Sequence, residues 1–159
     1  MEDTLISEAR SKVEALLERR SHLNTYEEKV EHALALVQMH FDSENPERID
    51  ECIRLYTDDA VWESPTRRAN YAGPAKIREM YLGLFGATED FTFEQVDRWA
   101  TPDHVFDDSI CRFRMMREGF ENAPFPLGTK VKIRLVHAFD IRDGLISREV
   151  GYETWFRDE

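Results

Sequence analysis

RLVHAFDIRDGLISREVGYETW (residues 134–155) reads as two alternating strands joined by a tight turn at residues 142–144. Asp-Gly at such a turn is a strong short-range signal for a β-hairpin. TKVKIRLVHAFDI (residues 129–141) extends the first of these strands. Because alternate side chains of a strand point to opposite faces, His137 and Phe139 share the apolar face. We therefore expect an ionisable ring inside an apolar sheet face.

The spacing of apolar residues along the chain changes near residue 90. Before that point apolar residues recur at helical spacing, over residues 4–20, 25–41, 45–56 and 73–85. Thr25 and Glu28 have the spacing of a capping box at the start of the second helix. After that point FTFEQVDRW (91–99) and VFDDSICRFRMM (105–116) alternate as strands. We predict a single α+β domain, with N-terminal helices packed on a strongly curved antiparallel sheet.

Composition excludes several classes of partner. The 159 residues carry a formal charge of -11, which repels nucleic acids and anionic membrane surfaces. The chain has no apolar run of about 20 residues that would span a bilayer and no secretory signal, so we expect a cytoplasmic protein. Cys52 and Cys111 lack metal-type spacing and are expected to be buried free thiols. Phosphate-binding glycine loops and metal clusters are missing from the sequence, so we expect no cofactor and no metal.

Three phrases carry a resemblance to a known family. YTDDAVWESP (56–65), YAGPAKIREMY (71–81) and VHAFDIRDGLI (136–146) resemble the SnoaL-like members of the nuclear transport factor 2-like superfamily. The resemblance implies residues 25–159 as the SnoaL-like domain and residues 1–24 as an additional N-terminal helix. It also implies a cone-shaped fold with an apolar pocket, which hosts isomerases, cyclases, dehydratases, epoxide hydrolases and non-enzymatic modules.

This chain lacks some of the acid and base residues that these relatives use. Cyclase-like members carry a histidine at the position of His137 and an aspartate fourteen residues later, where this chain has Gly151. Epoxide-hydrolase members need the same acid. Steroid-isomerase-like members use an aspartate before the proline that follows the first strand, but Ser64 precedes Pro65 here. His40 lies close to the position where isomerases place an oxyanion-donating tyrosine. We expect His137 to be neutral near pH 7, with open space at Gly151, unless another carboxylate replaces the lost acid.

Two other acids have the parity of Gly151. Glu149 and Glu153 are predicted to point into the cone and, with His137, to form the catalytic set; the alternative for both is a solvated strand edge. The residues predicted to line the ligand pocket, as an alternative to plain core positions, are Trp62, Ser64, Tyr81, Trp99, Phe139 and Gly151. Arg67 and Arg68, in the loop after Pro65, are expected to be solvated.

The outer face of the sheet carries a basic stripe, formed by Arg112, Arg114, Lys130, Lys132 and Arg134. Like charges on neighbouring strands destabilise a sheet, so acidic groups should cover them. Glu94 and Asp108 would do so within the chain, and a second copy would do so in a homodimer, as the resemblance implies. Two functions follow from these features: a pocket protein for a small, largely apolar molecule, with or without proton transfer at His137, or an interaction module that uses this outer face.

Overall fold

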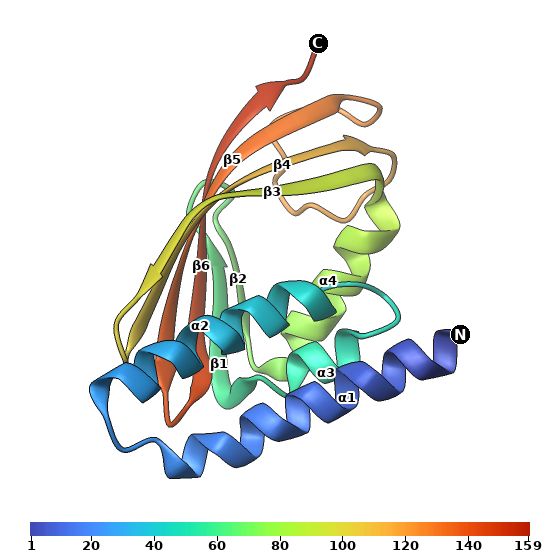
Figure 1. Cartoon of the computed structure of the whole chain (residues 1–159). Helices are drawn as coiled ribbons and strands as arrows, with labels where there is room; N and C mark the ends of the chain where they lie inside the picture. The colour runs from blue at the N-terminus through green and yellow to red at the C-terminus, as the bar shows by residue number, and fades with distance from the viewer.

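The computed structural model describes residues 1–159, except for the side chain of Glu2. Helices cover one side of a strongly curved, open six-stranded sheet with the strand order β2-β1-β6-β5-β4-β3 (Figure 1). The helical elements are α1 (Glu2–Arg19), the 3-10 turn η1 (Arg20–His22), α2 (Tyr26–Ser43), α3 (Ile49–Ile53) and α4 (Pro74–Ala87). The strands are β1 (Tyr56–Ser64), β2 (Ala69–Ala72), β3 (Thr88–Ala100), β4 (His104–Met115), β5 (Lys130–Arg142) and β6 (Leu145–Arg157). The predicted α+β class and curved sheet are confirmed, and the strand pairs are antiparallel apart from β1 and β6, which run parallel.

The register of β4, β5 and β6 brings one row of inward-facing residues together. His137 in the middle strand lies opposite Asp107 of β4 on one side and opposite Gly151 of β6 on the other. The hairpin at Asp143 and Gly144 is present as predicted, and both residues have positive φ, 53° and 72°, as a two-residue type I′ turn requires. The turn therefore sets the β5–β6 register that positions His137.

The helical half differs from the prediction at one element. The capping box of α2 is confirmed, since the Glu28 amide donates to the Thr25 hydroxyl and the Glu28 carboxylate accepts from the Thr25 amide. The predicted helix over residues 45–56 is much shorter, because Asn45 accepts a hydrogen bond from the Arg48 amide at 3.0 Å in a turn before α3. Tyr56 opens β1 instead of closing that helix.

Two apolar clusters fill the cone at different heights. The larger one lies under α2, α3 and α4, and the smaller one packs the distal part of the sheet under the loop that joins β4 to β5. Helix α1 packs on α2 and α3, burying Ala9 and Val13, and lies outside the layer that covers the sheet (Figure 1). None of the helices in the described chain is long and apolar enough to cross a membrane.

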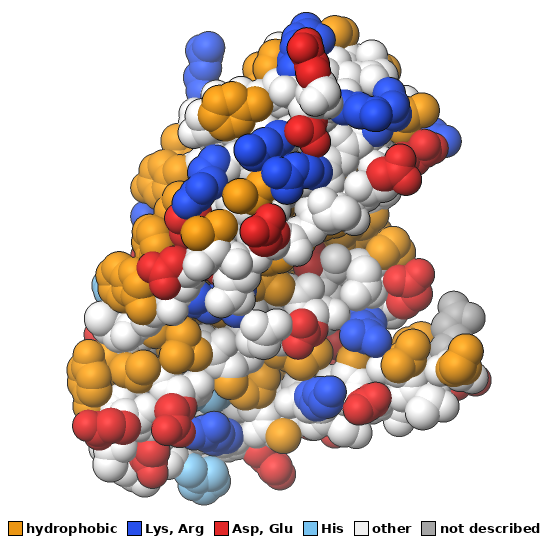
Figure 2. Space-filling model, turned by 45° about the horizontal axis from the view of Figure 1, so that its top comes forward, with side chains coloured by type: hydrophobic (Ala, Val, Ile, Leu, Met, Phe, Trp, Pro, Cys, Tyr) orange, Lys and Arg blue, Asp and Glu red, His pale blue; other side chains and the backbone are white. Residues whose placement is uncertain are grey.

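The basic stripe on the outer face is partly neutralised within the chain. Arg134 forms a two-bond ion pair with Asp108, with a shortest distance of 2.5 Å. Arg112 lies 3.5 Å from Asp158 and 3.8 Å from Glu94. Figure 2 shows acidic side chains among the Lys and Arg side chains over this part of the sheet. Intrachain pairing was one of the two expected outcomes, and a second copy of the chain is not required to neutralise these two arginines.

Candidate functional site

A buried carboxylate, Glu149, lies at the centre of a cluster of buried polar side chains. Its side chain comes from β6 and is 1% exposed. The Tyr56 hydroxyl of β1 donates a short hydrogen bond to one carboxylate oxygen, and the Tyr81 hydroxyl of α4 lies 3.1 and 3.2 Å from the two oxygens. Burial and the nearby carboxylate raise the pKa of both tyrosines well above the usual value, so both remain neutral donors.

Two histidines from different elements lie near the same carboxylate. His40 Nε2 lies 3.4 Å, and His137 Nε2 lies 4.0 Å, from Glu149 Oε1. Burial disfavours the charged carboxylate, but His40 first, then His137 and the Tyr56 hydroxyl, hold the Glu149 pKa below its usual value. For His40, burial favours the neutral ring, but the charge of Glu149 outweighs it and raises the His40 pKa well above 6.5. The interior therefore holds an ionised carboxylate beside a charged imidazole.

A second carboxylate orients His137. Asp107 Oδ1 lies 3.3 Å from His137 Nδ1, and the Asp107 carboxylate also accepts bonds from Arg98 at 2.8 Å and Ser109 at 2.5 Å. Burial raises the pKa of Asp107, but its bonds to His137, Ser109 and Arg98 lower it more, so this acid is ionised. An ionised Asp107 favours the tautomer in which Nδ1 carries the hydrogen, and it leaves Nε2 directed at Glu149.

A separate ion pair, between Arg67 and Glu153, fills the distal side of the interior. The guanidinium is 2.9 Å from the Glu153 carboxylate, and its carbon lies 5.6 Å from the ring centres of both Trp62 and Phe120. Arg67 is 3% exposed, so the expectation that this arginine is solvated is wrong. The Trp155 indole donates to the same carboxylate at 2.7 Å. The Glu153 carboxylate is therefore held by Arg67 and Trp155.

The comparison with protein families decides the relationship. The model of the SnoaL-like domain matches residues 37–149, which is most of the chain. The chain belongs to the SnoaL-like family. No curated protein matches the sequence.

Solved structures show the same fold at low sequence identity. An NTF2-like protein from Burkholderia xenovorans LB400 has a TM-score of 0.65 at 12% identity, over 79% of this chain and 91% of that one. An LEH-like epoxide hydrolase from M. tuberculosis has a TM-score of 0.62 at 16% identity, over 79% and 84%. A protein assigned as a SnoaL-like polyketide cyclase, from Shewanella putrefaciens CN-32, has a TM-score of 0.61 at 15% identity, over 74% and 86%. These similarities establish the fold and leave the reaction open.

In this SnoaL-like domain the predicted catalytic residues all lie inside the cone. His137 is 6% exposed, and the solvated edge considered for Glu149 and Glu153 is not observed. Their catalytic role stays a prediction. His137 is also not left without an acid, because Asp107 and Glu149 both lie near its ring nitrogens.

The predicted pocket residues divide into two groups. Trp62, Ser64, Tyr81 and Phe139 are buried in the interior, although the Ser64 hydroxyl faces the Arg67 amide at 3.4 Å in the turn after β1. The placement of Trp99 in the interior is wrong, because its side chain is 53% exposed and stacks on Phe106 on the outer face. A shift in the β3 register between Gln95 and Asp97 separates the two halves of that strand, so strand parity cannot be carried along its whole length.

Gly151 does not leave open space in the interior. A Cβ atom added there would lie 3.3 Å from Leu135 Cδ1, so the leucine side chain already packs against this position. The expectation of a vacancy at Gly151 is wrong. Leu135 takes the space beside the glycine, and Asp107 and Glu149 supply the carboxylates near His137 instead.

Two members of the cluster, Asp107 and Tyr56, were not predicted from the sequence. Asp107 alternates with Val105 and Ser109 on the inward face of β4, so strand parity contained the signal that could have found it. Tyr56 was assigned to a helix, and nothing local revealed that its hydroxyl meets a residue 93 positions away. Among the described side chains, no group of three His, Cys, Asp or Glu residues is placed to hold a metal ion.

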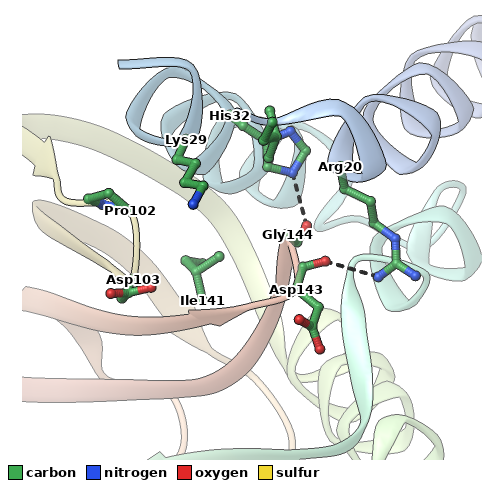
Figure 3. Close-up of a pocket in the computed structure, with 9 residues that line it drawn as sticks. Arg20, Lys29, His32, Pro102, Asp103, Ile141, Asp143 and Gly144 are labelled. Carbon is green, nitrogen blue, oxygen red and sulfur yellow. Dashed lines mark hydrogen bonds between the residues drawn. The ribbon is translucent and has the colours of Figure 1, made fainter. Parts of the chain in front are cut away.

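A cavity of about 300 Å³ lies away from this cluster, at the corner where the β5–β6 hairpin meets the helices (Figure 3). His32 Nε2 lies 2.9 Å from the Gly144 carbonyl, and Arg20 donates to the Asp143 carbonyl at 3.1 Å. In Figure 3 the Lys29 side chain points between these groups and Asp103. None of the residues around Glu149 lines this cavity, so the predicted ligand pocket at His137 stays a prediction.

Proposed function

We propose that this SnoaL-like domain binds a small, largely apolar molecule inside the cone and transfers a proton on it, with His137 as the acid and base. The observation that carries the proposal is the buried cluster of Asp107, His137 and Glu149, which come from three adjacent strands. Ionisable groups enclosed together and given shifted pKa values are typical of active sites. The name of the polyketide cyclase with this fold is consistent with such a step.

The geometry suits general base catalysis by His137. Asp107 favours a hydrogen on Nδ1, so His137 would exchange a proton with a ligand through Nε2. The 4.0 Å separation between Nε2 and Glu149 is too long for a hydrogen bond, so Nε2 is free to accept a proton from a ligand. Asp107 Oδ1 lies 3.3 Å from Nδ1 and Glu149 Oε1 lies 4.0 Å from Nε2, so both carboxylates are near the ring that takes up the proton.

The surroundings of His137 indicate a flat apolar carbonyl compound as the substrate class. The ring centres of Phe41 and Phe139 lie 5.1 and 5.6 Å from the His137 ring, so a bound molecule would meet aromatic surfaces. In the proposed step the C–H bond next to the carbonyl breaks, its proton moves to Nε2 and its electron pair moves onto the carbonyl oxygen. Return of the proton from Nε2 at another carbon completes an isomerisation. In a cyclisation the carbanion attacks a second carbonyl, whose π electrons move onto its oxygen, and that alkoxide takes the proton from Nε2.

Deuterium exchange tests the proposal without a known substrate. The protein would be incubated with a panel of apolar and aromatic ketones in heavy water, and deuterium uptake next to the carbonyl measured by mass spectrometry. Native mass spectrometry of the untreated protein would guide the panel through any co-purified molecule. We expect His137→Gln to lower the exchange rate about a hundredfold, the lower end of what a positioned acid or base contributes.

His104→Gln provides the matched control. His104 also pairs with an aspartate, Asp140, at 3.1 Å, but its side chain is 66% exposed on the same sheet. Exchange that persists unchanged in His137→Gln, or that falls equally in His104→Gln, would refute the role of His137.

The outer face of the sheet favours a second role, as a contact surface for another copy of the chain. Trp99, Tyr152 and Phe156 are 53%, 49% and 47% exposed there, and apolar side chains gather along one margin of this face (Figure 2). We propose a homodimer through this face. Sedimentation equilibrium should give a dimer mass, and Trp99→Glu should lower it towards the monomer, whereas Tyr26→Glu on α2 should not. A monomeric wild type would rule the dimer out.

A further inference from the structure

His40 connects the buried carboxylate to the solvent side of α2. Its Nε2 atom lies 3.4 Å from Glu149 Oε1 and 3.4 Å from Glu44 Oε2. The His40 side chain is fully buried, and its Nε2 has no hydrogen bond of good geometry within the described chain. Glu149 is 1% exposed, whereas the Glu44 side chain is 24% exposed. One ring nitrogen therefore lies between an enclosed acid and an acid that water reaches.

The other ring nitrogen is held as a donor. Cys52 Sγ lies 3.2 Å from His40 Nδ1, and its S–H points to the His40 carbonyl at 3.6 Å, which leaves the sulfur as an acceptor. The Tyr56 oxygen lies 3.4 Å from Nδ1, and its hydrogen is committed to Glu149, so it is an acceptor too. Two acceptors facing Nδ1 favour a hydrogen on that atom. Proton gain and loss at His40 are thereby confined to Nε2.

We propose that His40 carries protons between Glu149 and solvent through Glu44. In one direction the charged His40 ring passes its Nε2 proton to Glu149 Oε1, and the same nitrogen then takes a proton from the Glu44 carboxyl oxygen. The reverse sequence discharges Glu149, and no other bond changes. A small rotation of the ring is enough because Nε2 is equally distant from the two oxygens.

This route rests on the proposed function for its purpose. A base that takes a proton from a bound ligand must then exchange that proton with water. A ligand beside His137 would block direct exchange between the His137 ring and water. The remaining neighbours of the His40 ring are aromatic and do not compete for the Nε2 proton: Phe41, Tyr81 and Phe139, with ring centres 5.0 to 6.0 Å away.

Nitrogen NMR of the ligand-free protein, labelled at the histidine rings, tests the route. The His40 signals would be identified by their loss in His40→Gln, and the exchange rate of the His40 ring protons with water measured. We expect Glu44→Gln to slow this exchange about a hundredfold, the lower end of the effect of one positioned acid or base. Glu47→Gln, an exposed acid three residues along the chain, should leave the rate unchanged.

Two results would overturn the proposal. One is an exchange rate in Glu44→Gln equal to that of the wild type. The other is a His40 Nδ1 shift typical of a nitrogen without hydrogen. Because no ligand is present, these outcomes do not depend on ketone exchange, and failure of the proposed function would leave them unaltered.

Discussion

Breaking the buried ion pair of Arg67 and Glu153 should destabilise the protein much more than breaking an exposed pair. The two side chains are 2% and 6% exposed. Arg67→Met keeps an apolar stem between Trp62 and Phe120 but leaves Glu153 charged and enclosed, with the Trp155 indole as its remaining strong donor. Removing one partner of a buried pair costs about 3–5 kcal/mol, and we expect a loss of that size in the free energy of unfolding.

A double-mutant cycle separates the pair from the other effects of the substitution. Glu153→Gln added to Arg67→Met removes the stranded charge and keeps an oxygen to accept the Trp155 hydrogen bond 2.7 Å away. Because replacing both members of a buried pair is often close to neutral, the double variant should recover most of the loss. Urea unfolding followed by tryptophan fluorescence measures all four proteins.

Arg142→Met supplies the reference for an exposed pair. Arg142 binds Asp59 at side chains that are 53% and 69% exposed, so solvent screens this pair and its removal should cost far less than the loss of Arg67. If Arg67→Met costs no more than Arg142→Met, water reaches the Arg67 site in solution and the dry interior inferred from the structure is wrong.

Three further predictions concern packing, pH and the first helix. Gly151→Asp adds a Cβ 3.3 Å from Leu135 and should lower the free energy of unfolding in urea by about 1–3 kcal/mol. The loss should be smaller when Leu135→Ala is present, and an unchanged stability of Gly151→Asp would contradict the close packing. Burial lowers the pKa of His32 below 6.5, despite the opposing bond to the Gly144 carbonyl. As the pH falls, His32 is therefore protonated in the unfolded chain before it is protonated in the folded protein. The contribution of the neutral His32 ring to the free energy of unfolding is therefore complete above about pH 6.5 and is lost below it. His32→Gln should reduce the fall in urea midpoint between about pH 7.5 and about pH 5.5, and a fall equal to that of the wild type would contradict this prediction. Deleting residues 1–24 should lower the thermal midpoint yet keep the sheet signal in circular dichroism, because α1 packs on other helices; complete loss of that signal would place α1 in the folding core.

Much of the sheet was predictable because its information is local. The alternation of residues 129–141 placed His137 and Phe139 on the inner face, and Asp143-Gly144 specified a turn with two positive φ angles. The same rule failed for Trp99, since a register shift in β3 is not encoded in the alternation of its side chains. The helix predicted through Tyr56 failed because a periodic apolar pattern does not reveal where a short turn ends it.

By itself, the sequence determined the fold class, the SnoaL-like resemblance and which face of β5 and β6 looks inward, because period, turn chemistry and capping act over a few residues. Tertiary structure alone decided which charges meet. Glu153 is neutralised by an arginine 86 positions away, and His137 has Asp107 as a partner from the neighbouring strand. An isolated carboxylate strongly disfavours burial, so whether Glu149 lies on a wet edge or in the interior depends on the donors that the rest of the chain brings to it. Tyr56, Tyr81 and His40 come from three other elements, and strand register together with helix packing, rather than any local motif, assembles them around it.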